Sequence, residues 1–243
     1  MIPFVLIHLA VFGAFWSGVT TSAVICAVVL YFVRMFAVTG GYHRYFSHRT
    51  YKTSRVFQFI LAFLAQSSAQ KGALWWAAHH RVHHRFSDKA GDLHSPVNDG
   101  FWYSHVGWLF NNTSDTDYSM IPDFARYPEL RFLNKYHLLP PILMGFVVWL
   151  ALGWSGLFIG FFASTVALWH GTFTINSLSH VFGKRRFATS DDSRNNWFLA
   201  IVTMGEGWHN NHHRFAASTR QGFYWYEYDF TFYILKVLSW LGI

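Results

Sequence analysis

Two long stretches without a charged side chain constrain the fold of this 243-residue chain more than any other feature. No Asp, Glu, Lys or Arg occurs in residues 1–33 or in residues 136–183. A helix rises about 1.5 Å per residue, and the hydrocarbon core of a bilayer is about 30 Å thick. The second stretch would extend about 72 Å as a helix, enough for two spans with a turn at residues 153–156. The first would reach about 50 Å, which predicts a hairpin with a short or tilted first limb and a break at residues 16–18.

The positions of the basic residues predict the orientation of these hairpins. All 19 Lys and Arg residues lie at position 34 or later, and none lies in residues 136–183. The two turns are therefore uncharged, and the positive-inside rule assigns everything between and after the hairpins to the cytoplasm. The predicted fold is an all-α integral membrane protein with four transmembrane helices and a cytoplasmic helical cap. We place the spans at residues 2–16, 19–38, 136–153 and 157–178, and the cap at residues 39–135 and 181–243, within a single domain of residues 1–243.

Composition excludes several other classes of protein. Charged residues make up 13% of the chain, about half the share of an ordinary globular protein. The single cysteine, Cys26, lies in an apolar span, so a disulfide framework or a cysteine-based metal site is excluded. The net charge of +7 fits attraction to anionic lipid headgroups. Because no RNA- or DNA-binding module is visible, nucleic acid is not an expected partner.

Histidines carry the chemical signal of the sequence. Eight of them form three clusters, and a ninth, His180, lies between the second cluster and the third. Neutral imidazole is a common ligand of iron, copper, zinc and nickel, and nine ligands exceed what one ion can take. The sequence therefore predicts a site for two metal ions, held by the cap. The clusters are His43 and His48; His80, His83 and His84; and His209, His212 and His213.

The spacing within the clusters indicates how they are arranged. Each of the two triplets has the spacing i, i+3, i+4, which puts its histidines on one face of a helix, where they could serve two ions. His43 and His48 are five residues apart, or about 140° around an ideal α-helix. Either they reach different metals, or the helix is distorted after Gly40-Gly41. An apolar stripe predicts an interfacial helix over residues 55–78 that leads to the second cluster.

The residues around these clusters resemble the three histidine boxes of membrane fatty acyl desaturases. The segments are Gly-Tyr-His43-Arg-Tyr-Phe-Ser-His48, His80-Arg-Val-His83-His84 and Gly205-Glu-Gly-Trp-His209-Asn-Asn-His212-His213, with Asn176-Ser-Leu-Ser-His180. The chain is most similar to the stearoyl-CoA, delta-9 branch in a compact bacterial form. The resemblance implies two iron ions held by His43, His48, His80, His83, His84, His180, His209, His212 and His213, with Asn176 acting through a water. It also implies that Trp76, Thr172 and Phe173 contact the substrate.

The implied activity is the introduction of a cis double bond, at the delta-9 position, into a saturated fatty acyl chain. Attack on an unactivated methylene needs a strong oxidant made from dioxygen and two electrons, in a mostly apolar site. Because these residues include no haem domain, we expect a separate ferredoxin-type or cytochrome-type donor and its reductase. The basic residues Lys184–Arg186, Arg214 and Arg220 would steer an acidic donor, although Lys184–Arg186 also fits a position facing lipid headgroups. The expected location is a bacterial inner membrane, with the active site on the cytoplasmic face.

The carrier of the acyl chain stays open at this point. Animal acyl-CoA desaturases have an Arg-Asp pair just before the second box, where this chain has Ala78 and His79. Coenzyme A, carrier protein and glycerolipid are therefore all possible carriers. His79 points away from the ligand face of its helix. We expect hydrogen-bonding or interfacial roles for His8, His94, His105, His137 and His170.

Two other functions compete with desaturation. A related di-iron hydroxylase or ketolase would use the same metals and oxidant. A metal transporter would place polar ligands at mid-membrane depth on discontinuous helices, whereas these clusters flank the spans on one side. The Asn176-Ser-Leu-Ser-His180 motif favours the desaturase.

Overall fold

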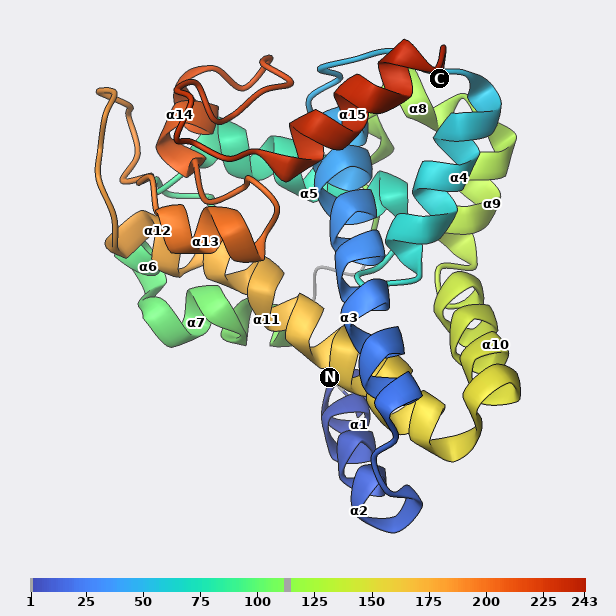
Figure 1. Cartoon of the computed structure of the whole chain (residues 1–243). Coiled ribbons are helices and arrows are strands. Elements are labelled where there is room, and N and C mark those ends of the chain that lie inside the picture. The colour runs from blue at the N-terminus through green and yellow to red at the C-terminus, as the bar shows by residue number, and fades with distance from the viewer. Residues whose placement is uncertain (1, 112–114) are drawn as a thin grey trace.

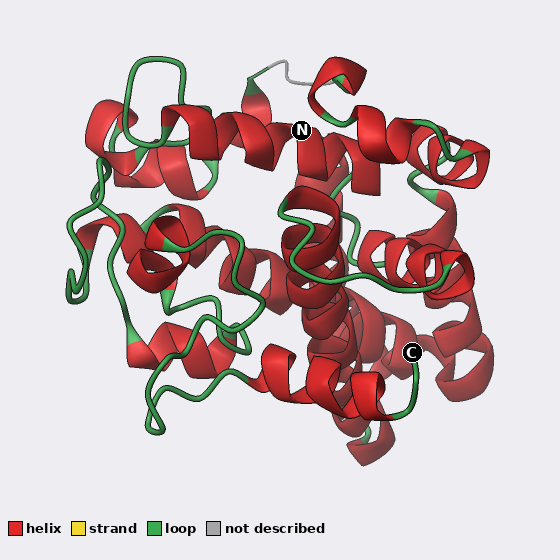
Figure 2. Ribbon diagram, turned by 90° about the horizontal axis from the view of Figure 1, so that it is seen from above, coloured by secondary structure: helices red, strands yellow, loops and turns green. Residues whose placement is uncertain are grey.

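The computed structural model describes residues 2–111 and 115–243 of the chain. Within these residues the secondary structure is helical, and the only extended pairing is two isolated bridges, Lys184 with Asn195 and Asn195 with Trp208. Long apolar helices extend from one side of a wider cap of short helices and loops (Figure 1), and the loops gather over the cap when it is seen from above (Figure 2). The predicted all-helical architecture is confirmed.

The N-terminal hairpin turns where the sequence predicts. Gly18 adopts a φ of 71°, a left-handed conformation that glycine takes without strain. Thr20 then begins the next helix, because its side-chain oxygen accepts a hydrogen bond from the Ala23 amide at 3.2 Å. The elements are α1 (Ile2–Ala10), the 3-10 helix η1 (Val11–Gly13), α2 (Ala14–Ser17) and α3 (Thr21–Phe36).

A second pair of apolar limbs lies beside the first. Its elements are α10 (Leu139–Ser155), the π-helix η5 (Gly156–Ala163) and α11 (Ser164–Asn176). Gly153, with a φ of 62°, breaks the helical geometry inside α10, and the chain reverses direction there (Figure 1). The turns of the two hairpins are joined by a 3.1 Å hydrogen bond from the Thr20 amide to the Ser155 hydroxyl.

The apolar limbs indicate association with a membrane. Two helices, Thr21–Ser47 and Leu139–Val181, are long and apolar enough to cross a bilayer. Large apolar side chains remain exposed along the limbs; Phe15 is 88% exposed and Trp16 is 71% exposed. Soluble proteins rarely expose continuous apolar surface of this kind, so lipid is its natural surrounding.

The helix α3 continues directly into a π-helix, η2 (Ala37–Ser47), whose residues are all buried. In a π-helix the backbone hydrogen bonds join residues five apart, and long π-helices are rare outside functional sites. At Gly41 this π-helix packs against α4 (Arg55–Gln66), where a β-carbon would be in ordinary van der Waals contact, 3.4 Å from the β-carbon of Leu61. A change of helix type, from α to π, thus occurs around Gly40-Gly41, where a distorted helix was one of the two possibilities.

The prediction of one helix over residues 55–78 is wrong. The chain forms two helices, α4 and α5 (Ala73–Phe86), separated by a turn in which Ala69 and Lys71 adopt positive φ angles. The Ser67 and Ser68 hydroxyls donate to carbonyl groups at the end of α4, which competes with helix continuation. The side chain of Gln66 then accepts a hydrogen bond from the Ala73 amide, so it connects the end of α4 to the start of α5.

Short helices complete the cap, and a buried arginine joins them to η2. Arg44 is 1% exposed and pairs with Glu206 at 2.9 Å and with Asp229 at 2.8 Å. Removing one partner of such a buried pair typically costs about 3–5 kcal/mol, so this arginine holds the C-terminal segment in place. The remaining elements are α6 (Pro96–Asp99), α7 (Phe101–His105), η3 (Gly107–Phe110), η4 (Tyr118–Met120), α8 (Pro122–Ala125), α9 (Pro128–Lys135), α12 (Leu178–Val181), α13 (Trp197–Val202), α14 (His209–Arg214) and α15 (Phe230–Trp240).

Candidate metal centre

The nine histidines that the sequence singles out meet inside the cap in two clusters. The first cluster contains His43, His48, His80, His84 and His212. The second contains His83, His180, His209 and His213. In each cluster the potential ligand atoms lie within 4.8 Å of one another, so each cluster could hold a metal ion.

The π-helix explains how His43 and His48 reach the same cluster. The His48 amide donates to the His43 carbonyl at 3.2 Å, which is the five-residue hydrogen bond of a π-helix. The two imidazole rings lie 4.8 Å apart between centroids. Of the two possibilities that the spacing allowed, the distorted helix is therefore the one found.

Each histidine triplet divides between the two clusters. On α5, His80 and His84 belong to the first cluster and His83 to the second. On α14, His212 belongs to the first cluster, and His209 and His213 belong to the second. His180, on α12, completes the second cluster, and its Nε2 lies 3.0 Å from Nε2 of His209. The i, i+3, i+4 spacing thus lets one short helix serve both clusters.

Four buried carboxylates orient the histidines from behind. Three of them accept a hydrogen bond from Nδ1 of one histidine, in the manner that commonly fixes the tautomer of a metal-bound imidazole, and Glu206 forms a close ion pair with Nδ1 of His43. Sequence reasoning missed these carboxylates, although the chain has only twelve acidic residues and that scarcity was a usable signal. The pairs are His43 with Glu206 at 2.5 Å, His83 with Asp92 at 2.9 Å, His180 with Asp88 at 2.7 Å and His213 with Asp191 at 2.9 Å.

This arrangement directs nitrogen lone pairs into the clusters. A neutral imidazole has one N–H, so a histidine that donates from Nδ1 keeps a lone pair on Nε2. The Nε2 of His43 lies 3.0 Å from Nε2 of His212, and the Nε2 of His213 is buried without a hydrogen-bond partner. These converging nitrogen atoms could hold a metal ion. The donor set therefore fits a first-row transition metal.

Burial lowers the pKa of several cluster histidines and so favours the neutral imidazole that metal binding requires. Burial, reinforced by the neighbouring histidines, holds the pKa values of His80, His84, His209 and His212 well below 6.5. Burial lowers the pKa of His213 to about 4, although Asp191 partly opposes the shift. Burial alone would raise the pKa of Glu206, but His43 and Arg44 outweigh it and lower the value to about 2. At neutral pH these five imidazoles are therefore neutral and the Glu206 carboxylate is charged.

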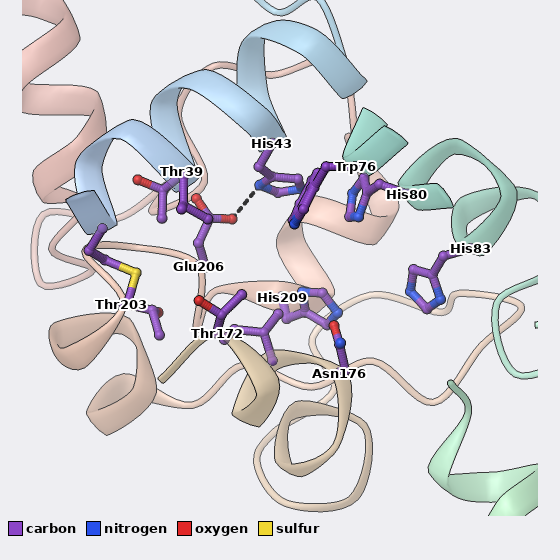
Figure 3. Close-up of a pocket in the computed structure, with 13 residues that line it drawn as sticks. Thr39, His43, Trp76, His80, His83, Thr172, Asn176, Thr203, Glu206 and His209 are labelled. Atoms are coloured by element: carbon purple, nitrogen blue, oxygen red, sulfur yellow. Dashed lines mark ion pairs between the residues drawn. The ribbon is translucent and has the colours of Figure 1, made fainter. Parts of the chain in front are cut away.

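A small cavity of about 40 Å³ opens beside both clusters. Trp76, Thr172 and Asn176, three of the residues singled out in the sequence, line it together with His43, His83 and His209 (Figure 3). The fourth, Phe173, lines a second cavity of about 250 Å³, and Trp76 forms part of both walls. Gln70, which the sequence did not reveal, lines the larger cavity and donates to the Thr172 hydroxyl at 3.2 Å.

Most of the other histidines lie away from the clusters. Nδ1 of His79 is 2.9 Å from the backbone carbonyl of Trp75, and the imidazole ring of His79 stacks on the indole ring of Trp75. His8, His170 and His105 form a row with nitrogen–nitrogen distances of 3.1 and 3.0 Å. The hydrogen-bonding roles predicted for these three histidines are confirmed.

His94 and Ala78 lie in positions that bear on the expectations from the sequence. His94 forms a third group with His83 and Asp92 that could hold a metal, and it therefore lies nearer the site than its predicted role implied. Ala78, one of the two positions that distinguish this chain from the animal acyl-CoA enzymes, is buried, with 1% of its surface exposed.

Comparison with known proteins gives a consistent result over nearly the whole chain. Residues 7–238 match the family model described as fatty acid desaturase. The chain is 36% identical to an sn-1 stearoyl-lipid 9-desaturase of Anabaena variabilis over 237 residues, covering 96% of this chain and 87% of that protein. It is 35% identical to acyl-CoA 5-desaturase AL21 of Anemone leveillei over 235 residues, covering 95% of this chain and 70% of that protein. It is 36% identical to delta-9 acyl-lipid desaturase 1 of Arabidopsis thaliana over 232 residues, covering 92% and 74% respectively.

Proposed function

The chain belongs to the fatty acid desaturase family, and we propose that it introduces a cis double bond at the delta-9 position of a saturated fatty acyl chain. As a member of this family, the chain is an oxidoreductase that acts on fatty acyl chains. The delta-9 position is supported by the similarity to the two 9-desaturases above.

The converging histidines are the observation that carries the proposal. We assign one iron ion to each cluster, with His43, His48, His80, His84 and His212 as ligands of the first. The second iron would take His83, His180, His209 and His213, and a water held by Asn176, which lines the cavity beside His209. Iron is favoured over zinc because the reaction needs a metal that exchanges electrons.

The two irons would supply the activation of dioxygen, and the protein would orient the ligands and limit the water beside the substrate. The balance is that a –CH2–CH2– unit loses two hydrogen atoms, while dioxygen takes up these two atoms, two electrons and two protons and leaves as two waters. Glu206, Asp88, Asp92 and Asp191 hold the imidazoles in fixed orientations. The small, mostly apolar cavity leaves little room for water beside the acyl chain.

The acyl chain would pass from the larger cavity to the smaller one along Trp76. Thr172 lies at this passage, where its hydroxyl is held by Gln70, and Phe173 lines the outer part. These contacts would set the methylene groups that lie beside the clusters. The carrier at the far end of the acyl chain would be coenzyme A, a carrier protein or a glycerolipid, since the relatives include both acyl-CoA and acyl-lipid enzymes.

The proposed topology follows from the apolar limbs and the basic cap. The four limbs would cross the membrane at residues 2–16, 19–38, 136–153 and 157–178, as parts of a single domain of residues 1–243. The cap of residues 39–135 and 181–243 would face the cytoplasm, because all the Lys and Arg residues lie at position 34 or later. A bacterial inner membrane fits this arrangement. Electrons would come from a separate ferredoxin-type or cytochrome-type protein and its reductase.

Lipid analysis of a desaturase-deficient host that expresses the chain tests the proposal. The wild-type protein should produce monounsaturated acyl chains with the double bond at the ninth carbon. His84→Ala should abolish this product because it removes a histidine of the first cluster. His79→Ala is the matched control, since His79 lies on the same helix but outside both clusters. A hydroxylated product, or equal activity of both variants, would contradict the proposal.

A further inference from the structure

A wide groove on the surface of the cap is lined by the chain neighbours of two histidines of the second cluster. Its volume is about 1050 Å³, and its walls come from the segment after α12, the start of α13 and the loop before α15. None of the predicted ligand or substrate residues lines it. The groove is therefore separate from the acyl path.

Basic side chains dominate the charge of this groove. Lys184, Arg185, Arg186 and Arg194 line it, against a single acidic residue, Glu227. Arg185 pairs with Asp192 at 3.1 Å, and Arg186 pairs with Glu227 at 2.5 Å. Among the described residues, the side chains of Lys184 and Arg194 have no hydrogen-bond or ion-pair partner, and Nε of Arg194 is buried without one. Two cations thus remain available for a negatively charged partner.

Two residues that line the groove are next in sequence to histidines of the second cluster. Val181 lines the groove and follows His180, and Trp208 lines it and precedes His209. Asn195 pairs with both Lys184 and Trp208 through backbone bridges, so one wall of the groove is tied to the segment that holds His209. Trp208 itself is 6% exposed, and its indole donates to the Tyr228 carbonyl at 2.8 Å. An aromatic residue that lines the groove is therefore the direct chain neighbour of His209 in the cluster.

We propose that this groove is the docking surface of an acidic protein that delivers electrons one at a time. The proposal rests on the proposed desaturase function, which needs two electrons for each double bond. A reduced carrier would dock, lose one electron through the Trp208 side of the groove and leave, and a second carrier would repeat the step. The two electrons would end in the two waters formed from dioxygen. Such encounters are brief and are guided by complementary charge.

Other basic residues of the cap are less suited to this role. The guanidinium of Arg220 donates to the Gly222 carbonyl and lies over the ring of Phe232. Its charge is therefore already engaged in contacts within the same chain. Lys52 is exposed but precedes α4, and neither histidine cluster includes a residue of that segment. The groove combines two available cations with residues that adjoin His180 and His209 in the chain. The exposed Trp197 and Phe182 at its edge, which are 66% and 65% exposed, would supply the apolar part of the contact.

A charge-reversal experiment on the iron-loaded enzyme tests the groove. The variant is Lys184→Glu with Arg194→Glu, and the control is Lys52→Glu with Arg126→Glu, which changes the net charge equally outside the groove. Turnover is measured with an acidic plant-type [2Fe–2S] ferredoxin and, in parallel, with dithionite-reduced methyl viologen. We expect the groove variant to raise the KM for ferredoxin at least about tenfold, within the range of electrostatic steering. The control should change this KM less than about twofold. Rising salt should raise the KM for ferredoxin most in the wild-type enzyme, because salt screens the attraction between charges.

The viologen measurement separates this proposal from the proposed function. If viologen drives no desaturation by the wild-type enzyme, the function itself fails. If viologen supports turnover and ferredoxin does not, or if both variants raise the KM equally, the docking proposal is overturned. It is also overturned if the groove variant keeps its KM for ferredoxin but loses affinity for vesicles containing phosphatidylglycerol, because the groove would then bind lipid headgroups.

Discussion

The carboxylate of Glu206 lies 2.5 Å from Nδ1 of His43, and both side chains are almost completely buried. The same carboxylate pairs with Arg44, so a single acidic group joins the π-helix to the segment that leads into α14. Because the carboxylate faces Nδ1, it favours the tautomer of His43 that keeps its proton on Nδ1 and presents the lone pair of Nε2 to the first cluster. Glu206 therefore acts on the centre through His43, without lying in either cluster itself.

Replacing Glu206 by glutamine should weaken iron binding at the first cluster. The amide keeps the shape of the side chain, but it loses the charge that fixes His43 and balances Arg44. Loss of such a supporting group typically costs about 10- to 100-fold in metal affinity or activity. Glu129→Gln is the matched control, since Glu129 pairs with exposed Arg55 on the surface. Equal iron affinity of the two variants, measured by competition with a chelator, would contradict the positioning role.

The purified protein should bind close to two irons per chain. His84→Ala should deplete the first cluster, and Asp191→Asn should weaken the second through His213. Metal analysis and Mössbauer spectroscopy would distinguish the two sites, because each variant should lose mainly one of the two iron signals. A fully active enzyme with a single metal ion per chain would refute the two-metal assignment. Zinc after overexpression would not, because zinc competes well for such sites.

The histidines and the apolar limbs could be predicted because their signals are local. Charge-free stretches and histidine spacing are both read within a few tens of residues, and they gave the turns at Gly18 and Gly153 and the facing histidines of α5 and α14. His180, the ninth candidate that the sequence offered, lies in the second cluster of the structure.

Features that depend on distant contacts could not be read in this way. Asp88 orients His180, which is 92 residues away in the sequence, and no local pattern marks the pair. After α4, the guanidinium of Arg34 donates to the Ser67 carbonyl at 3.3 Å, a contact between residues 33 apart in the sequence. The π-helix likewise requires burial against α4 and α5, since its five-residue hydrogen bonds are intrinsically unfavourable compared with those of an α-helix.

The metal-free protein should lose stability as the pH falls below about 6.5. Histidines in an unfolded chain titrate near pH 6.5, whereas burial lowers the pKa of His213 to about 4 and keeps those of His80 and His84 well below 6.5. Between these values the unfolded state binds more protons than the folded state, so acid favours unfolding. The unfolding temperature of the metal-free protein in detergent should be highest above pH 7 and should fall steadily from pH 6.5 to pH 4. The variant His80→Phe, His84→Phe should show a shallower dependence, and an unfolding temperature that rises toward pH 5 would contradict the argument.

A bulky residue at position 172 should shorten the acyl chains that the enzyme accepts. Thr172 lines the cavity beside the clusters and is held by Gln70, so Thr172→Trp would fill the passage next to Trp76. Overpacking a fitted apolar cavity typically costs about 1–3 kcal/mol, which corresponds to about a five- to hundredfold change in preference. Thr174→Trp is the control, because Thr174 lies on the same helix but lines neither cavity. Substrates of two chain lengths, supplied as coenzyme A thioesters and as glycerolipids, give the product profiles to compare. If Thr172→Trp keeps its iron and desaturates both lengths as well as the wild type, the acyl chain does not pass this residue.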